Sequence, residues 1–104
     1  VLFPAEAAPP QAGKAEGEKL WPLPIEDDYL DMIKSDVADM KNSGGRWGGA
    51  ITAALFLREF VAEGIPWAHL DIAGPAFVES DKPNRPAGGT GVMVRTLLRY
   101  IEEQ

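Results

Sequence analysis

The sequence predicts an α/β protein in which a helix, a strand, a long loop and a second helix follow one another. Three observations support this prediction. Residues 48–62 hold good helix formers, with no glycine or proline after Gly49. Residues 67–72 alternate between two faces as strands do, and residues 92–102 carry apolar side chains at helical spacing. This order of elements is typical of the tail of an α/β layer structure.

The helix expected at residues 48–62 is apolar on almost every side. Gly64 and Pro66 stand just past its end as a stop signal, and only Arg58 and Glu59 need contact with water. A helix that is apolar nearly all round is a buried helix. A chain of 104 residues can hardly wrap such a helix with its remaining segments. We therefore expect something outside this sequence to cover it.

The first part of the chain is expected to hold little regular structure. Residues 1–19 are rich in Pro, Ala, Gly and Glu and cannot offset the entropy of ordering, which predicts a flexible linker or a loosely held arm. The domain segment is then expected to span residues 20–104. Residues 26–33 have the spacing of a short amphipathic helix. Residues 35–49 form a polar, glycine-dense connection, which indicates positive φ angles or a close backbone approach.

The last part of the chain is expected to form a buried strand, a loop and a capped helix. The strand covers residues 67–72, and a proline- and glycine-rich loop covers residues 74–91. Thr90 or Gly89 is expected to cap a helix at about residues 92–102. The apolar face of that helix carries Val94, Leu97, Leu98 and Ile101.

Length, charge and composition exclude several classes of protein. The chain has 104 residues, a net charge of −6 and no cysteine. It therefore forms one domain at most, with neither a disulfide framework nor a thiolate metal site. The acidic balance argues against nucleic acid as the main partner. The longest apolar run, residues 53–57, is far too short to span a membrane, and the start lacks the layout of a signal peptide. Because the chain opens at Val1 rather than Met, we expect a processed or excised piece.

Two groups of residues could carry metal or acid–base chemistry, and each has a simpler alternative. Asp36 and Asp39 stand three residues apart and could share a metal. They could also satisfy backbone donors of the glycine-rich turn, which we favour because no further ligand is nearby. His69 and Asp71 share a face of the expected strand and could form an acid–base pair. A hydrogen-bonded core histidine is the favoured interpretation.

Residues 88–91, Gly-Gly-Thr-Gly before the last helix, have the look of an anion cradle. They lack the lysine of a P-loop and the preceding strand of a dinucleotide fingerprint, so we favour a plain helix cap. Ser43 has no base close to it in the sequence, which argues against a nucleophilic role. Trp21, Trp47 and Trp67 are expected to be core or interface anchors rather than a platform for ligand stacking.

Four blocks of the sequence point to a known family. The blocks are residues 35–42, 49–57, 67–74 and 89–97, and Trp-Pro-Leu-Pro at residues 21–24 precedes them. In this order they resemble the C-terminal part of the leucyl aminopeptidase family (cytosol aminopeptidase, peptidase family M17). The resemblance implies that the chain is the C-terminal portion of a mixed-sheet catalytic domain flanked by helices.

The resemblance implies a two-metal aminopeptidase that removes N-terminal residues from peptides with a Leu-type preference. The parent enzyme would hold two divalent ions, Zn or Mn, and would be a cytoplasmic homo-hexamer. The acidic balance and the short apolar runs, rather than the resemblance, lead us to expect no nucleic-acid or membrane partner. The family's metal ligands and its catalytic Lys and Arg lie in motifs upstream of the matched region, and none of those motifs occurs here. We therefore expect no catalytic residue and no metal ligand in this chain, which should be inactive without the rest of the enzyme.

Carried over position by position, the resemblance places three residues at the substrate pocket. Ala73 and Ala76 match positions that border the pocket for the substrate's N-terminal side chain, and Ser43 matches a position on the leaving-group side. Small side chains there would leave room for Leu or Met. The simpler alternative is that alanines at a tight strand end only pack. For the chain as a whole, the competing hypothesis is a truncated, non-catalytic paralogue that acts as a protein-interaction module.

Overall fold

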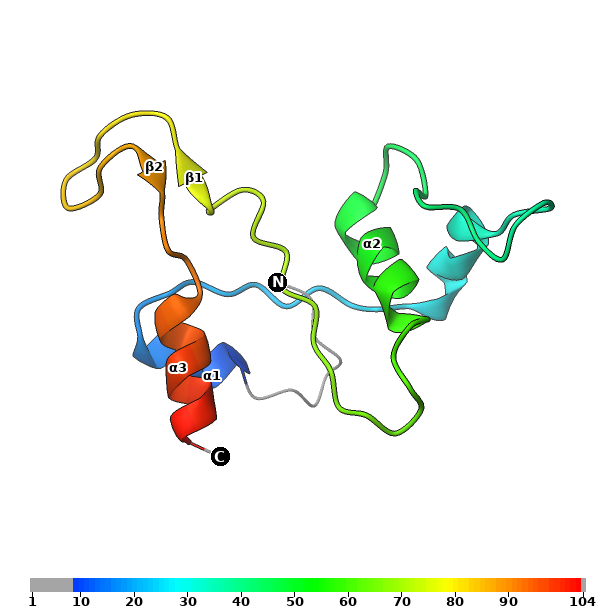
Figure 1. Ribbon diagram of the computed structural model, residues 1–104, viewed down its shortest axis with the longest axis horizontal. Coiled ribbons are helices and arrows are strands. Elements are labelled where there is room, and N and C mark those ends of the chain that lie inside the picture. Colours follow the sequence, from blue (N-terminus) through cyan, green and yellow to red (C-terminus); the bar gives the residue numbers. More distant parts are fainter. Residues whose placement is uncertain (1–8, 104) are drawn as a thin grey trace. The chain divides into compact units, whose positions relative to one another are not determined.

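The computed structural model describes residues 9–103 and divides them into two compact units, each of which is described by itself (Figure 1). The terminal unit contains residues 9–21 and 71–103, and the middle unit contains residues 22–70. The helices among these described residues lack the length and apolar character needed to cross a bilayer.

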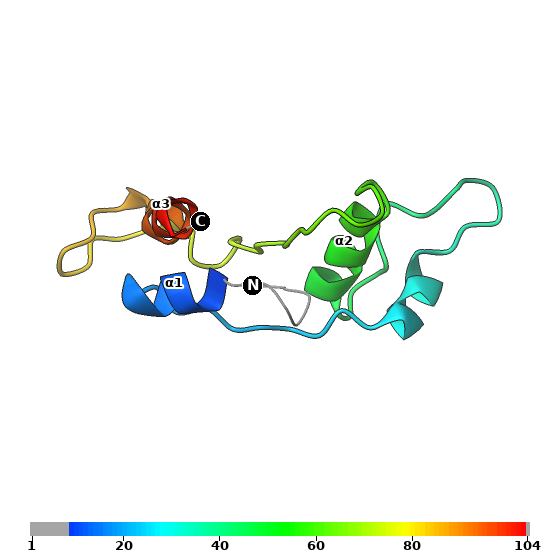
Figure 2. The ribbon, with the colours of Figure 1, turned by 90° about the horizontal axis from the view of Figure 1, so that it is seen from below.

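The terminal unit is built from two helices and a short hairpin. Its elements are α1 (Pro9–Ala15), β1 (Phe77–Val78), β2 (Gly88–Gly89) and α3 (Val94–Glu102). The strands are antiparallel, with Phe77 opposite Gly89 and Val78 opposite Gly88. Helices α1 and α3 lie side by side in both ribbon views (Figures 1 and 2). The hairpin falls inside the loop predicted at residues 74–91, so that loop has a short sheet at its base.

Helix α1 lies inside the stretch that was expected to be a linker or a loose arm. The composition there is poor in large apolar residues, but Ala12 is buried. Glu16, just past the helix, forms an ion pair of 3.1 Å with Arg99 of α3. The structure therefore differs from the expectation at residues 9–19, because contacts with a segment distant in the sequence order this stretch. Residues 1–8 lie outside the described residues.

The middle unit pairs a 3-10 helix, η1 (Asp27–Ile33), with helix α2 (Gly49–Arg58). Ile33 of η1 and Ala54 and Leu55 of α2 are the buried apolar residues of this unit. Asp27 in the first turn of η1 accepts a hydrogen bond of 2.6 Å from the Arg58 guanidinium at the end of α2. The short helix predicted from the sequence is thus present, with 3-10 rather than α-helical turns.

Helix α2 is shorter and less enclosed than predicted. It ends at Arg58, where the N–H of Phe60 donates to Leu57 O and the N–H of Val61 donates to Arg58 O in tight turns. Leu55 is fully buried, but Leu57 is 45% exposed and Phe60 is 71% exposed. One side of the helix is therefore buried by η1, and the described part of the chain leaves the other side open.

The strand predicted at residues 67–72 is an extended segment with a single bridge residue, His69. A strand is defined by hydrogen bonds to a partner, and the described residues supply no ladder along this segment. The predicted burial is also incomplete, since the side chains of residues 67–71 are half-buried and Ile72 is exposed. Alternation in the sequence identifies the extended backbone here but not its partner.

Helix α3 begins two residues later than predicted and leaves its apolar side exposed. The residue before it, Met93, has a left-handed backbone conformation with φ of 72°. Thr96 is the residue of α3 that is fully buried. The apolar residues that share one face are between 40% and 68% exposed: Val94, Leu97, Leu98 and Ile101.

Candidate functional site

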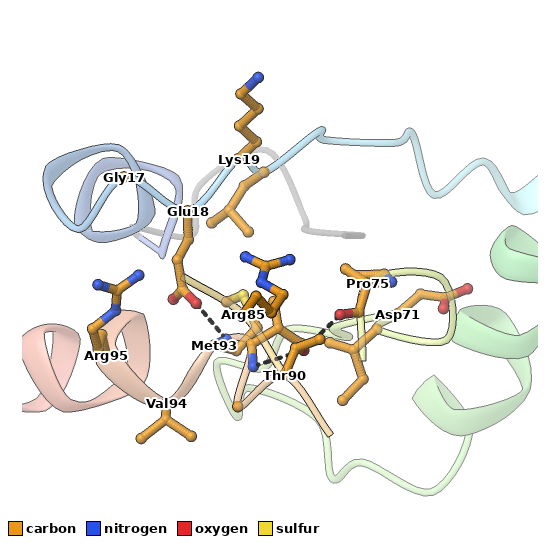
Figure 3. A pocket seen from close by; sticks show the side chains of 14 residues that line it. Gly17, Glu18, Lys19, Asp71, Pro75, Arg85, Thr90, Met93, Val94 and Arg95 are labelled. Atoms are coloured by element: carbon orange, nitrogen blue, oxygen red, sulfur yellow. Dashed lines mark hydrogen bonds between the residues drawn. The ribbon is translucent and has the colours of Figure 1, made fainter. Parts of the chain in front are cut away.

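A cavity of about 620 Å³ lies in the terminal unit, where residues 17–20, the turn after the extended segment and the start of α3 come together (Figure 3). Its charged lining residues are Glu18, Lys19, Asp71, Arg85 and Arg95. Both signs of charge are therefore present in the lining, as two acidic and three basic side chains.

The carboxylate of Glu18 caps the N-terminus of α3. Its Oε1 accepts a hydrogen bond of 2.9 Å from the Met93 N–H (Figure 3), and Oε2 accepts from the N–H and the hydroxyl of Thr96 at 3.2 and 2.5 Å. The first N–H groups of a helix have no partner inside it, and negative charge is favourable at this end. The cap expected from Thr90 or Gly89 is therefore wrong, and a residue far earlier in the chain supplies it.

The pKa of the Glu18 carboxyl is lowered from its ordinary value of 4.5. Burial is the largest single influence and acts to raise the pKa, but the hydrogen bonds from Thr96 and Met93 and the positive charge of Arg95 together outweigh it. An anion does bind backbone N–H groups close to residues 88–91. It is the Glu18 carboxylate of the chain itself, and the N–H groups are those at the start of α3.

Thr90 joins the segment before α3 to the turn at residues 72–76. Its N–H donates to Ala76 O at 2.9 Å, and its hydroxyl donates to Pro75 O at 2.6 Å (Figure 3). The same hydroxyl accepts a hydrogen bond of 3.3 Å from the Val92 N–H. Gly91, between these residues, has a φ of 66°, a left-handed conformation that favours glycine.

Ala73 and Ala76, which were predicted to border the substrate side-chain pocket, both lie in this turn. The Ala73 N–H donates to Asp71 Oδ1 at 3.1 Å, and the Ala76 N–H donates to Ile72 O at 2.9 Å. Ala73 is exposed and Ala76 is half-buried. Neither lines the 620 Å³ cavity, to which the neighbouring Ile72 and Pro75 contribute. Their place at a substrate pocket stays a prediction.

Ser43, predicted on the leaving-group side, belongs to the middle unit. It is exposed, its Oγ accepts a hydrogen bond of 3.4 Å from the Gly45 N–H, and it lines a small cavity of about 90 Å³. A Cβ on Gly44 would lie 2.7 Å from Cγ2 of Thr52 in α2. Of the two features predicted for this glycine-rich connection, positive φ is confirmed at Gly45 and Gly48, with φ of 93° and 63°, whereas Gly44 approaches the Thr52 side chain rather than another backbone. The role of Ser43 stays a prediction.

The remaining acidic candidates do not form a metal site. Asp36 and Asp39 are exposed, and the nearby N–H groups of Val37 and Ala38 donate to Ser35 Oγ at 3.3 and 3.1 Å. The Ser35 hydroxyl therefore accepts backbone hydrogen bonds that the two carboxylates were expected to accept. Among residues 9–103, no three His, Cys, Asp or Glu side chains are grouped so that they could hold a metal ion.

The aromatic and histidine candidates are less buried than expected. His69 is half-buried rather than a core residue, and the Asp71 carboxylate accepts its hydrogen bond from Ala73. Trp21 is 77% exposed and Trp47 is 74% exposed, so neither is a core anchor. The alternative of an interface anchor stays a prediction.

Comparison with known proteins identifies the family. The sequence profile of the cytosol aminopeptidase family, catalytic domain, matches residues 5–98. The chain belongs to this family. A probable cytosol aminopeptidase of Rhodopirellula baltica is 63% identical over 92 residues, and one of Synechococcus elongatus is 59% identical over 91 residues. Each match covers 88% of this chain and 18% of the relative, so the chain spans less than a fifth of the length of these aminopeptidases.

Solved structures of aminopeptidases and related enzymes confirm the predicted fold class. The bottromycin maturation enzyme BotP in complex with Mn matches with a TM-score of 0.85 and 43% identity, over 91% of this chain and 21% of that one. A mutant of tomato leucine aminopeptidase matches with a TM-score of 0.83 and 44% identity, over 92% of this chain and 18% of that one. The helices and the small sheet are therefore folded as in the corresponding part of these enzymes.

Sequence reasoning missed Glu18. It lies in a stretch whose composition predicts a linker, and its partners are 75 and 78 residues away. One weak signal was available, because the apolar residues Val92 and Met93 cannot cap a helix with their own side chains. The N–H groups of α3 must then find an acceptor elsewhere in the chain or in solvent.

Proposed function

We propose that the chain is the C-terminal segment of a longer two-metal aminopeptidase, which removes N-terminal residues from peptides with a Leu-type preference. The observation that carries this proposal is the family match over residues 5–98, made by a chain that covers 18% of its relatives. The similarity to tomato leucine aminopeptidase supports the preference. The rest of that longer chain would be the first partner of this segment.

In the proposed enzyme this segment forms walls of the substrate site and makes or breaks no bond. Ala73 and Ala76 would border the space for the substrate's N-terminal side chain, where their small size leaves room for Leu or Met. Ser43 would lie on the leaving-group side. The hydrogen bonds of Thr90 and Asp71 to the turn support this assignment, because a pocket wall needs a fixed backbone.

The metal ions of the proposed enzyme do not belong to this segment. We propose two divalent ions, Zn or Mn, and the Mn in the BotP complex supports a divalent metal. The residues present do not fit such a centre, since residues 9–103 hold no group of three potential ligands. The ligands are therefore assigned to parts of the enzyme outside this chain.

The family membership also supports a proposal for the assembly and the location of the enzyme. The names of the curated relatives, which are cytosol aminopeptidases, support a cytoplasmic location. We also propose a homo-hexamer for the complete enzyme, as the family resemblance implies. Native mass measurement of the complete protein tests this assembly.

The proposed function is tested by comparing the native protein that carries this segment with the 104-residue chain alone. The longer protein should hydrolyse leucine p-nitroanilide in the presence of Mn²⁺ or Zn²⁺, and a chelator should abolish the turnover. The 104-residue chain alone should be inactive with either metal, because it holds no grouped ligands among its described residues.

Two results would overturn the proposal. Metal-dependent turnover by the 104-residue chain alone would show that the catalytic groups were misplaced. A native protein of only this length, without peptidase activity, would favour the alternative of a non-catalytic interaction module.

A further inference from the structure

The turn at residues 72–76 is held from outside by Thr90. Within the turn, the Ala76 N–H donates to Ile72 O at 2.9 Å. From outside, the Thr90 N–H donates to Ala76 O at 2.9 Å, and the Thr90 hydroxyl donates to Pro75 O at 2.6 Å. One residue therefore fixes two successive carbonyl groups of the turn, one through its backbone and one through its side chain.

The hydroxyl bond is the part of this contact that depends on the amino-acid type. Every residue except proline would supply the N–H at position 90, but a hydroxyl on Cβ is specific to Thr and Ser. The ring of Pro75 fixes its φ, so the orientation of its carbonyl depends on ψ alone. The bond from Thr90 restrains that orientation and, with it, the position of the Ala76 side chain.

The segment that carries Thr90 is restrained by hydrogen bonds as well. Its hydroxyl accepts a hydrogen bond from the Val92 N–H, and the next residue, Met93, is bound by the carboxylate of Glu18. Figure 3 shows the Glu18–Met93 and Thr90–Pro75 bonds among the residues that line the 620 Å³ cavity. Loss of the hydroxyl also removes the bond from the Val92 N–H. The bond from the Met93 N–H to Glu18 remains, so the turn should move more than the segment that carries Thr90.

We propose that Thr90 is a positioning residue for substrate specificity, whose hydroxyl holds Pro75 and Ala76 so that the turn keeps the shape of the pocket for the substrate's N-terminal side chain. The inference rests on the proposed function, because it needs Ala76 to border that pocket. A residue that only stabilises the fold affects all substrates alike. A residue that shapes a pocket changes the ratio between a large and a small side chain.

The test uses the complete aminopeptidase with Thr90→Val, which keeps the side-chain shape and removes the hydroxyl. The ratio of kcat/KM for leucine over alanine p-nitroanilide should fall roughly three- to tenfold, in line with the loss of one hydrogen bond. The fall should come mainly from a higher KM for the leucine substrate, because the catalytic groups are untouched. Thr90→Ser, which restores the hydroxyl, should return the ratio to within about twofold of the parent enzyme.

Two further variants separate positioning from stability. Thr90→Ala removes the same hydroxyl without a methyl group in its place, so a folded protein is available even where the valine variant fails to fold. Thr96→Val removes a hydroxyl that bonds to Glu18 and does not contact the turn. It should lower the midpoint of thermal unfolding and leave the leucine-to-alanine ratio unchanged.

Ala76→Phe, measured in the same assays, separates failure of this inference from failure of the proposed function. If Ala76→Phe shifts the ratio and neither hydroxyl-free Thr90 variant does, the inference on Thr90 alone is wrong. An equal shift in Thr96→Val also contradicts it, since the effect would then follow stability. If Ala76→Phe leaves the ratio unmoved, the pocket assignment falls and the inference falls with it.

Discussion

The sequence predicts α2 from its helix formers and α3 from its apolar spacing, yet the two helices pack in opposite ways. In α2, the fully buried large side chain is Leu55, which lies in the middle unit with Ile33 of η1. In α3, the fully buried side chain is Thr96, and the apolar face that includes Leu98 and Ile101 is exposed. One helix is therefore held by apolar contacts, and the other is held by its polar side.

The difference teaches that apolar spacing shows which face of a helix is suited to burial, not what lies against it. Polar groups of α3 bind the N-terminal segment, through Glu18 at the helix start and through the ion pair between Glu16 and Arg99. These contacts use the side of α3 opposite to the one that periodicity marks. The apolar face of α3 is exposed, as expected for a chain that spans only 18% of the length of its relatives and lacks most of their residues.

The largest effect expected from this comparison is self-association of the 104-residue chain through α3. Exposed apolar faces of this kind promote association. In sedimentation experiments the chain alone should be oligomeric or aggregated. Replacing Leu98 and Ile101 with Lys should shift it towards the monomer.

The matched control for this prediction is the exposed C-terminal end of α2 together with the turn that follows it. Leu57→Lys with Phe60→Lys changes the same number of apolar residues, and those residues are 45% and 71% exposed. The shift should be smaller than for the α3 pair, because the α3 face holds two further exposed residues, Val94 and Leu97. If the unsubstituted 104-residue chain sediments as a folded monomer, the prediction is contradicted.

The apolar core of α2 gives the next largest effect. Leu55 is fully buried within its own unit, so Leu55→Ala should lower the free energy of opening of α2 by about 2–5 kcal/mol. Hydrogen exchange at the α2 amides, measured in the monomeric lysine variant, checks this value. Leu57→Ala, on the exposed side of the same helix, should cost clearly less. Equal costs would show that burial in α2 has been wrongly assigned.

Ala76 and Ser43 extend the comparison of the two units to substrate recognition. In the complete enzyme, Ala76→Phe should lower the ratio of kcat/KM for leucine over alanine substrates about tenfold or more, while turnover of the alanine substrate persists. Ser43→Phe should instead change the preference for the residue after the cleaved bond, measured with a series of leucine dipeptides. Loss of activity on all substrates alike would show that the alanine only packs the turn.

The sequence alone predicts the local elements of the two units but not the contacts between distant segments. Local patterns predicted η1, α2 and the helical character of residues 94–102, because these depend on neighbours in the sequence. The cap of α3 could not be predicted, since Glu18 is 75 residues from Met93. The partner of the extended segment at residues 67–72 could not be predicted either, because alternation describes one chain and pairing needs two. The pocket residues came from family resemblance and not from any local signal.

The smallest effect concerns the polar side of α3, through Glu18. Its pKa is lower in the folded protein than its ordinary value of 4.5, so its contribution to stability is complete above pH 4.5 and disappears as the pH falls through the lowered pKa. Glu18→Gln should lower the free energy of opening at the start of α3 by about 1 kcal/mol at neutral pH, because a charged helix cap is lost. It should also remove the pH dependence of that opening below pH 4.5. Hydrogen exchange at the amides of Met93 and Thr96 between pH 3 and pH 7, with the intrinsic rates corrected for pH, measures both changes. An opening free energy that falls equally with pH in the glutamine variant would show that another group holds the start of α3.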